Sequence, residues 1–289
     1  VTNIDTEDET NNRETHIRFK EPGDDDEHEK ISYIREEQNG EKDGLYTTSY
    51  NSEPTYQTWS EGKLLDSFTY TEGVLTREMY CEYTGDDVYT DTTRYYPDGR
   101  LRSKEPELNG DDHGLQVLYS EDGSMLHQIK YSYGIKDGIF EMFFDDGIRW
   151  RLRYYKDGKL DGPCEEYYSD AGHPIKFKCN YKDGELDGAY ESFTREGIKT
   201  SYTEYKNGLK DGVYRKYAYG NTSSSTIHVI GQYSQGKETG EWLYGYNNEG
   251  WVEKVFYEDG VKVWDEKIDG KVRTYYNQDG SVSHTEEKP

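Results

Sequence analysis

The residues that could do chemistry in this 289-residue chain are seven histidines, three cysteines and 59 acidic residues. No two histidines have the spacing of a metal site: they are His16, His28, His113, His127, His173, His228 and His284. The cysteines, Cys81, Cys164 and Cys179, lack the C-x-x-C spacing of a zinc ribbon or a redox motif. The sequence has neither a G-x-S-x-G motif nor a P-loop. We therefore predict no catalytic, cofactor-binding or metal-binding residues, and a protein that is not an enzyme.

The charge balance narrows the class of partner. Lys and Arg number 35 against 59 Asp and Glu, which gives a formal charge of -24 at pH 7. A surface this negative repels nucleic-acid phosphates and anionic lipid headgroups, so we expect neither nucleic acid nor membrane as the main partner. The expected partner is another protein, neutral or basic, with a glycan as the alternative. No apolar run approaches the roughly 18 to 20 residues of a membrane-spanning helix, which predicts a soluble protein.

A repeat of glycine pairs organises most of the chain. Seven pairs have three residues between their glycines: Gly40/Gly44, Gly110/Gly114, Gly134/Gly138, Gly158/Gly162, Gly184/Gly188, Gly208/Gly212 and Gly236/Gly240. From Gly114 to Gly240 the second glycine recurs every 24 to 28 residues. A fixed period of this length is the sequence signature of a repeat architecture. We predict that each pair forms a tight connection between consecutive strands, so that both of its glycines are structural turn glycines.

The segments between the glycine pairs have the pattern of β-hairpins. An Asp-Gly turn follows an aromatic run in several repeats, and glycine closes such a turn because it tolerates a positive φ. In the return segment 148–155, apolar side chains alternate with Arg149, Arg151 and Arg153, a period of two that is typical of a strand. No segment has a helical period. We therefore predict an all-β fold: an elongated, single, twisted antiparallel meander of about seven to eight β-hairpin repeats.

The regularity of the repeats divides the chain. Residues 1–30 carry a run of acidic residues from Asp24 to Glu27 and few apolar residues, which predicts an acidic, flexible N-terminal tail. Residues 31–113 are expected to form irregular hairpin repeats, because the spacing is degraded between 44 and 110. Residues 114–260 are expected to form the regular repeats of about 24 residues. Residues 261–289 are expected to form a capping hairpin and a tail.

Aromatic residues take the place of a thick apolar core. The chain has 30 Tyr and is only 31% hydrophobic, and a sheet without a second layer buries surface by laying wide side chains on their neighbours. Equivalent positions five residues after the second glycine predict a ladder of rings: Tyr119, Phe143, Tyr167, Phe193 and Tyr217. These five residues, with Trp150 and Trp242, are also the candidate partner-binding aromatics. Packing alone, a peptide-binding surface and a sugar-binding platform stay open as alternatives.

Cys164 and Cys179 test the register of one hairpin. If Ala171 and Gly172 form a two-residue loop, the two cysteines are directly opposed and close enough to form a disulfide. If instead the turn widens to keep the faces of neighbouring hairpins aligned, the two sulfurs point to opposite sides. A disulfide and a pair of free, packed thiols are both open on this evidence.

The repeat consensus resembles a known family. The segments YKDGKLDGPCEEYYSDAG and YKDGELDGAYESFTREG are similar to the MORN-repeat variant family, whose bacterial members include YwqK-type, antitoxin-like proteins. The resemblance covers about residues 31–283, with departures in the irregular repeats and the acidic tail. It implies a ribbon of β-hairpins that acts as a structural or protein-binding scaffold without enzymatic activity. Because such arrays occur in bacterial envelope proteins and in large DNA viruses, it also favours an envelope or secreted location after processing, with a viral particle component as the alternative.

Three functions follow from these observations. The leading hypothesis is a non-catalytic repeat protein whose acidic, tyrosine-lined face binds another protein. The second is a carbohydrate or cell-wall binding module, in which exposed aromatic rings stack on sugars. The third is an antitoxin-like inhibitor that neutralises a basic toxin through its carboxylates.

Overall fold

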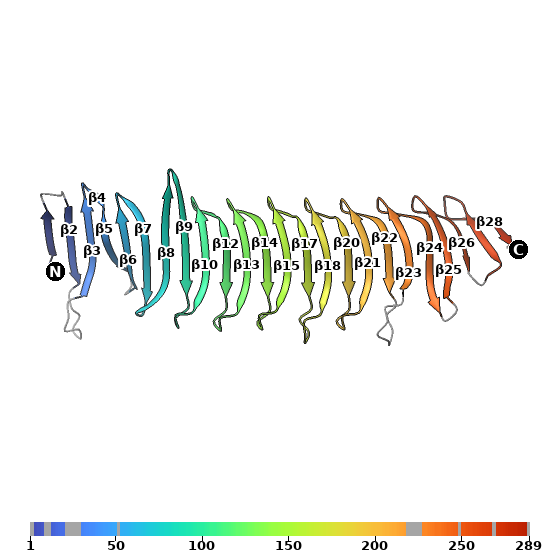
Figure 1. Cartoon of the computed structure of the whole chain (residues 1–289), viewed down its shortest axis with the longest axis horizontal. Helices are drawn as coiled ribbons and strands as arrows, with labels where there is room; N and C mark the ends of the chain where they lie inside the picture. Colours follow the sequence, from blue (N-terminus) through green and yellow to red (C-terminus); the bar gives the residue numbers. More distant parts are fainter. Residues whose placement is uncertain are drawn as a thin grey trace. The chain divides into compact units, whose positions relative to one another are not determined.

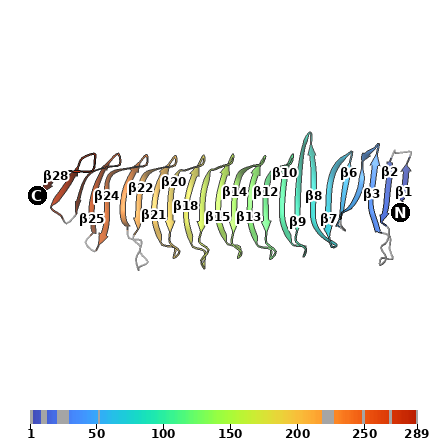
Figure 2. The same ribbon diagram turned by 180° about the vertical axis from the view of Figure 1, so that it is seen from behind.

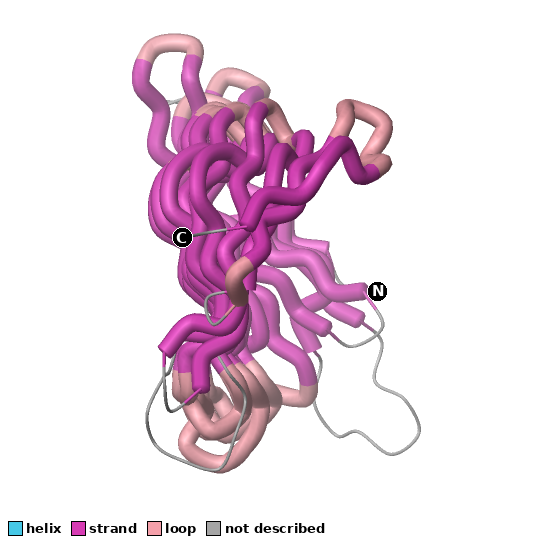
Figure 3. Tube along the Cα trace, turned by 90° about the vertical axis from the view of Figure 1, so that its right-hand side faces the viewer, coloured by secondary structure: helices cyan, strands magenta, loops and turns pink. Residues whose placement is uncertain are grey.

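The structure, a computed structural model, describes the chain except for residues 1–2, 9–12, 21–29, 51–52, 218–226, 248–249, 268–269 and 288–289. The described residues form strands and turns, and no helix occurs among them (Figure 3). This confirms the predicted all-β fold of antiparallel hairpins. The chain divides into unit 1, Val1–Lys136 with Asp145–Gly147, and unit 2, Asp137–Phe144 with Ile148–Pro289.

Within each unit the strands follow one another in chain order, and all paired strands are antiparallel (Figures 1 and 2). Each two-residue strand is continued by the strand after it, so that both pair with the same preceding strand. Unit 1 contains β1 (Asn3–Asp8), β2 (Arg13–Lys20), β3 (Lys30–Gln38), β4 (Glu41–Lys42), β5 (Gly44–Tyr50), β6 (Glu53–Ser60), β7 (Lys63–Thr71), β8 (Val74–Thr84), β9 (Asp87–Tyr95), β10 (Leu101–Leu108), β11 (Asp111–Asp112), β12 (Gly114–Tyr119) and β13 (Met125–Ser132).

Strand β14 (Ile135–Phe143) starts at the end of unit 1 and has most of its residues in unit 2. The other strands of unit 2 are β15 (Arg149–Lys156), β16 (Lys159–Leu160), β17 (Gly162–Tyr167), β18 (Ile175–Lys182), β19 (Glu185–Leu186), β20 (Gly188–Phe193), β21 (Lys199–Lys206), β22 (Leu209–Tyr217), β23 (Ile227–Ser234), β24 (Lys237–Asn247), β25 (Gly250–Glu258), β26 (Val261–Lys267), β27 (Val272–Tyr276) and β28 (Val282–Glu287).

The two glycines of a pair have different roles, which corrects the prediction that the pair forms one tight connection. Asp157 and Gly158, with φ of 48° and 78°, form the two-residue turn after β15. Gly162 is separated from β16 by one residue and starts β17, so it interrupts a strand rather than turning the chain. Its φ is 119°, and a Cβ there would lie 3.1 Å from the Cβ of Tyr154. Both facts favour glycine at this position.

The same correction applies to the second glycine of the other pairs. Gly138 lies inside β14 and Gly212 lies inside β22, so the prediction that these two are turn glycines is wrong. The chain has already reversed at the first glycine of each pair, and Gly138 and Gly212 then continue a strand, with φ of 122° and 114°. Gly240 likewise lies inside β24, and the remaining second glycines begin strands: Gly44, Gly114 and Gly188.

The first glycine of every pair lies in a turn, as predicted. Each has a φ between 74° and 94° and follows a residue that also has a positive φ, as in the two-residue turns of β-hairpins. These turn glycines are Gly40, Gly110, Gly134, Gly158, Gly184, Gly208 and Gly236.

The Asp before the second glycine links one repeat to the next. The Asp161 Oδ2 atom accepts a hydrogen bond of 3.2 Å from the backbone N–H of Asp183, in the following turn. Asp187 accepts the equivalent bond from Asn207, at 3.3 Å. Sequence reasoning interpreted this Asp-Gly pair as a turn signal, but here the Asp caps its neighbour's turn.

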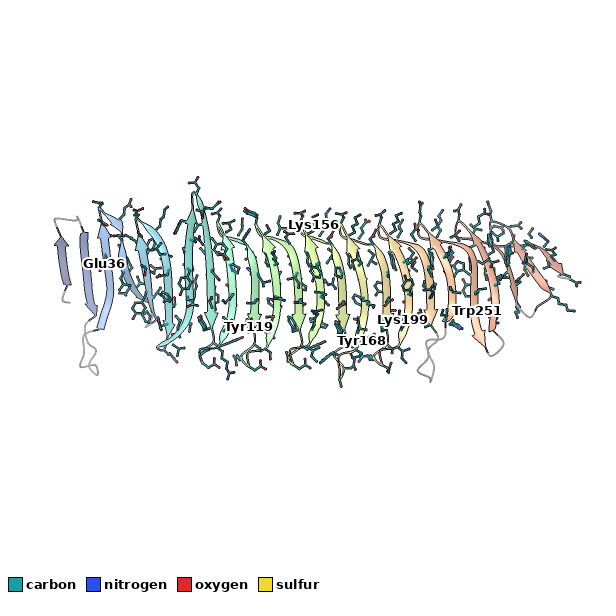
Figure 4. The ribbon with its side chains drawn as sticks, in the orientation of Figure 1. Glu36, Tyr119, Lys156, Tyr168, Lys199 and Trp251 are labelled. Atoms are coloured by element: carbon teal, nitrogen blue, oxygen red, sulfur yellow. The ribbon has the colours of Figure 1, made fainter. Side chains whose placement is uncertain are left out.

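The strands of unit 2 have turns of different kinds at their two ends. In Figure 4, Lys156 lies at the end with the glycine-pair turns, whereas Tyr168 and Lys199 lie near the other end. At that second end Thr194 N–H donates to the carbonyl of Ile198 at 2.8 Å, and Gly197 closes the loop with a φ of 79°. A glycine turn after the aromatic run of a repeat was predicted from the sequence, and Gly197 lies in such a turn.

The best-buried aromatic packing in unit 2 lies on one face of the sheet. Trp242 is 2% exposed and packs with Val229 and Val255. Its ring centre lies 5.5 Å from that of Tyr214 and 5.1 Å from that of Tyr233. We define the tyrosine face as the sheet face that carries these residues.

The ring ladder predicted from the five-residue offset is therefore wrong in position. The packed rings Tyr190, Tyr214 and Trp242 lie two residues after the second glycine, not five. Because side chains alternate along a strand, residues at offsets of two and five point to opposite faces.

The N-terminal segment also differs from its prediction. Strands β1 and β2 lie within residues 1–30, the segment predicted as a tail, and β2 pairs with β3. The acidic run from Asp24 to Glu27 lies outside the described residues.

Candidate protein-binding face

The negative charge of the chain is concentrated in unit 1. Unit 1 contains 33 of the 59 acidic residues and 14 of the 35 basic residues, whereas unit 2 contains 26 and 21. Unit 2 is therefore close to charge balance, and unit 1 supplies most of the net charge. A partner chosen by charge would be drawn mainly to unit 1.

Within unit 1, the carboxylates of β7, β8 and β9 gather on one face of the sheet. Asp66 is opposite Tyr80 across β7 and β8, and Tyr80 is opposite Asp91 across β8 and β9. Directly opposed residues share a face, and so do residues two apart on one strand, which adds Glu78 and Glu82. We call the acidic face the surface formed by Asp66, Phe68, Glu78, Tyr80, Glu82 and Asp91.

The basic residues of the same three strands lie on the other side of the sheet. Arg77 and Arg94 are opposite one another across β8 and β9, in the alternate register position. Arg94 forms an ion pair of 3.1 Å with Glu105. Lys63 Nζ lies 5.0 Å from the centre of the Tyr83 ring, and Tyr83 points to the same side as Arg77. The acidic face therefore receives no counter-charge from its own strands.

The acidic face has an exposed aromatic residue at its centre. Tyr80 is 49% exposed, and its ring packs edge-on against Phe68 with 5.8 Å between centres. Partial burial, followed by the charges of Glu78 and Asp66, raises the pKa of the Tyr80 hydroxyl. The phenol therefore stays protonated at neutral pH and can donate a hydrogen bond.

The carboxylates of the acidic face are incompletely satisfied within the chain. Tyr95 donates a hydrogen bond from its hydroxyl to Glu78 Oε1, and this bond is the main cause that raises the pKa of Tyr95 to about 12. In contrast, Asp66 Oδ1 and Asp91 Oδ1 are shielded from solvent and have no hydrogen-bond partner among the described residues. Buried oxygens without a donor are unusual in folded proteins. The two carboxylates that flank Tyr80 therefore accept fewer hydrogen bonds from the described residues than they could.

Carboxylates in unit 2 are arranged differently. Glu141 is only 5% exposed and pairs with Arg149 at 2.8 Å. Glu191 pairs with both Lys178, at 3.2 Å, and Lys199, at 2.9 Å. Cross-strand ion pairs of this kind place a positive charge beside each of these carboxylates on the neighbouring strand. The unbalanced carboxylates of β7–β9 are thus not a general property of the repeat.

The five candidate aromatics at the five-residue offset are partly buried and contact residues of their own chain. Tyr119, Phe143, Tyr167, Phe193 and Tyr217 are all half-buried. Tyr167 donates to Glu165 at 2.9 Å, and Lys199 Nζ lies 5.8 Å from the ring centre of Phe193. None of the five belongs to β7, β8 or β9, the strands of the acidic face.

The two tryptophan candidates are enclosed by their neighbours. The prediction that Trp242 contacts a partner is wrong, because its ring is buried in the tyrosine face. Trp150 is half-buried: Phe144 lies 6.2 Å from its ring centre, and the guanidinium of Arg151 lies 4.5 Å from it.

Sequence reasoning missed the acidic face because it interpreted residues 44–110 as degraded repeats. A signal was nevertheless present in β8, where Glu78, Tyr80 and Glu82 recur with a period of two. The pairing of this strand with Asp66 and Asp91 needed the register, which the irregular spacing hid.

No group of three or more His, Cys, Asp or Glu side chains is arranged to hold a metal ion in the described part of the chain. Nor do the described residues include a helix long and apolar enough to cross a bilayer. In comparisons with known proteins, no family model matches the chain, and no curated protein matches it significantly.

Proposed function

We propose that the chain is a non-catalytic, MORN-like repeat scaffold that binds a basic protein through the acidic face of β7–β9. The observation that carries the proposal is the segregation of charge on these strands. Asp66, Glu78, Glu82 and Asp91 share one face, while Arg77 and Arg94 lie on the other. A structural role alone gives no reason for this segregation, because like charges on neighbouring strands repel each other.

The chemistry of the face favours lysine or arginine from a partner. A long basic side chain can lay its apolar stem on the Tyr80 ring, where the ring face attracts the cation, and reach a carboxylate at either side. The cross-strand pairs place Asp66 and Asp91 two strands apart, a span of about 10 Å. An extended partner segment can therefore engage both with separate basic residues.

The acidic face supports one of the two alternative functions considered from the sequence more than the other. Antitoxin-like inhibition of a basic toxin is a more specific form of the same proposal, since the acidic face would carry it. A carbohydrate-binding module has less support, because Trp242 is 2% exposed and Arg151 lies over the Trp150 ring. A sugar ring needs an open aromatic face to stack on.

The proposal is tested by neutralising the acidic face. The variant combines Asp66→Asn, Glu78→Gln, Glu82→Gln and Asp91→Asn, which keep the size of each side chain. An exposed ion pair contributes about 0.2–1 kcal/mol, so the loss of four should weaken binding by about 1–4 kcal/mol, or roughly fivefold to several-hundredfold. The partner is first isolated from the native source by affinity purification on the unmodified chain. The complex of the two proteins is then cross-linked with a carbodiimide, which joins carboxylates to lysine amines. Its affinity for each variant is then measured by calorimetry.

The matched control removes the same charge elsewhere. It combines Asp183→Asn, Glu185→Gln, Glu258→Gln and Glu287→Gln, four exposed positions in unit 2. We expect the control to bind nearly as well as the unmodified chain, with cross-links at Asp66, Glu78, Glu82 or Asp91. Equal weakening by both variants would mean that only net charge matters. Cross-links confined to unit 2 would place the binding surface elsewhere.

A further inference from the structure

Two cysteines face one another inside unit 2. Cys164 of β17 and Cys179 of β18 are directly opposed in the antiparallel register. Cys164 is 1% exposed and Cys179 is 7% exposed, and both are free thiols. Opposed residues in an antiparallel pair have Cα atoms about 4.5–5.5 Å apart, a range that lies within the separation of disulfide-bonded cysteines.

The loop of this hairpin is wider than the two-residue turn considered from the sequence. Tyr168 N–H bonds to the carbonyl of Pro174, and His173 N–H bonds to that of Asp170. The wide loop does not send the sulfurs to opposite sides, as the sequence analysis expected of it. The cysteines occupy the same register positions as Phe140 and Arg153 in the hairpin of β14 and β15.

The cysteine pair lies beside the half-buried, positively charged side chain of Arg153. Arg151 is opposite Glu166 across β15 and β17, and continuing this register places Arg153 opposite Cys164. The Arg153 Nε atom is buried and has no hydrogen-bond partner among the described residues. A hydrogen bond from Cys179 lowers the pKa of the Cys164 thiol, and the charges of Arg153 and Arg151 lower it further, against desolvation and the charge of Glu166. The thiolate is the reactive form of cysteine, and a nearby guanidinium stabilises it.

We propose that Cys164 and Cys179 are a redox-active pair that a small hydroperoxide converts to an intramolecular disulfide, with Arg153 as the positioning residue for the Cys164 thiolate. The inference is independent of the acidic face, since all three residues belong to unit 2. It depends on the opposed register of the two cysteines and on the position of Arg153 opposite Cys164. The Arg153 Nε atom has no hydrogen-bond partner among the described residues, while its Nη2 atom lies 3.7 Å from Glu166 Oε2.

The reaction balances in two steps. The Cys164 thiolate attacks one oxygen of hydrogen peroxide and breaks the O–O bond, which gives a sulfenic acid on Cys164 and, after protonation, water. Cys179 then attacks the sulfenic sulfur, forms the S–S bond and releases a second water, with its own thiol proton as the proton source. Overall two thiols lose two electrons, and the peroxide is reduced to two waters. The contact between the sulfurs favours the second step over further oxidation of Cys164.

The position of Cys164 and Cys179 in the sheet determines which oxidants can reach the thiols and what a disulfide between them would do to the fold. Strands β17 and β18 have neighbours on both sides, β15 and β20 (Figure 1), so the hairpin that carries the cysteines is not at an edge of the unit 2 sheet. Peroxide is small enough to reach thiols with so little exposure, whereas a bulky disulfide such as oxidised glutathione is hindered. The product bond would join the two strands of one hairpin without changing their register.

The test uses the full chain with Cys81→Ser, so that Cys164 and Cys179 are the only thiols. The folded protein is treated with hydrogen peroxide, quenched with catalase, and alkylated in denaturant. We expect both thiols to disappear together, a non-reduced digest to contain a peptide linked through Cys164 and Cys179, and dithiothreitol to restore both. Two outcomes overturn the proposal: oxidation of Cys164 to sulfinic acid while Cys179 stays alkylatable, or two free thiols at a peroxide concentration that oxidises the urea-unfolded chain.

The role of Arg153 is tested by rate. Arg153→Gln should slow disulfide formation about tenfold for each unit by which the pKa of Cys164 rises, whereas Arg153→Lys, which keeps the charge, should restore most of the rate. Arg215→Gln, on another strand, should leave the rate unchanged. Equal rates for the Gln and Lys variants would remove Arg153 from the mechanism, because a purely structural role does not distinguish charge.

Discussion

The contact between Trp242 and Gly231 makes a sharp prediction about how unit 2 is stabilised. An ideal Cβ on Gly231 would lie 2.1 Å from Cδ2 and 2.3 Å from Cε2 of Trp242. Both atoms belong to the fused ring system, which cannot rotate away because Val229, Val255 and four half-buried tyrosines pack around it. The φ of Gly231 lies outside the left-handed region, so alanine meets no backbone strain there. The expected effect of Gly231→Ala is therefore steric.

The magnitude follows from two opposing effects. Overpacking a closely packed site costs about 1–3 kcal/mol. Glycine in a strand is itself less favourable than alanine by about 0.5–1 kcal/mol, which alanine recovers once the clash is gone. Gly231→Ala should therefore destabilise the native protein, but in a Trp242→Ala background it should be neutral or slightly stabilising. Trp242→Ala alone should cost about 3–5 kcal/mol, the range for a buried tryptophan.

The assay is a double-mutant cycle on the full chain. Urea unfolding, followed by far-UV circular dichroism, gives the free energy of unfolding of each variant. Hydrogen exchange of the amides in β22–β24 shows which unfolding transition includes Gly231 and Trp242. Gln232→Ala is the matched control, since its side chain leaves the same strand on the opposite face. We expect a coupling energy of about 1.5–4 kcal/mol between Gly231 and Trp242. Additive effects, or a destabilising Gly231→Ala in the absence of the indole, would refute the packing argument.

Two further predictions concern the links between and within repeats. Asp187→Ala should remove the bond to the Asn207 amide, cost about 0.5–1.5 kcal/mol and speed exchange of that amide, while Asp187→Asn keeps the acceptor and should have little effect. At Glu166, burial would raise the pKa, but the hydrogen bond from Lys176 and the charge of Arg151 outweigh it and lower the pKa. This stabilisation is present above the unfolded pKa of about 4.3 and is lost as the pH falls through the lower, folded value. In urea titrations, Glu166→Gln should thus be destabilising at pH 7 and nearly neutral in strong acid, and a pH-independent difference would contradict this.

The hairpin architecture could be predicted from the sequence because its signals are local. Alternation along 148–155 predicts a strand wherever that strand lies, and an Asp-Gly or glycine turn needs only its own backbone angles. The role of Gly162 could not be predicted in this way, since its place at the start of a strand depends on how closely Tyr154 approaches it. The function of Asp161 was hidden for the same reason, because its partner amide, that of Asp183, belongs to the next repeat.

The exposure of individual aromatic residues was the least predictable property. In a two-layer protein, an apolar residue on the inner face of a strand is buried, but a single sheet offers no inner face. Trp242 is buried because glycine, at position 231, leaves room for the indole on the neighbouring strand and because Val229 and Val255 pack against it. Trp150, with Arg151 over its ring, stays half-buried. The sequence pattern predicted both tryptophans as exposed partner-binding residues. Their different burial depends on the residues of neighbouring strands that pack against each ring.

The same reasoning explains why charge placement is informative in this fold. Both faces of an uncovered sheet can hold charged residues, so the repeat itself does not dictate which face carries which sign. Unit 2 pairs its carboxylates across strands, as Glu191 does with Lys178 and Lys199. Strands β7–β9 leave Asp66 and Asp91 unpaired beside Tyr80, because Arg77 and Arg94 of the same strands lie on the opposite face. Repulsion between these carboxylates opposes folding of the isolated chain and is relieved when a cation docks, so the arrangement favours the bound state over the free one.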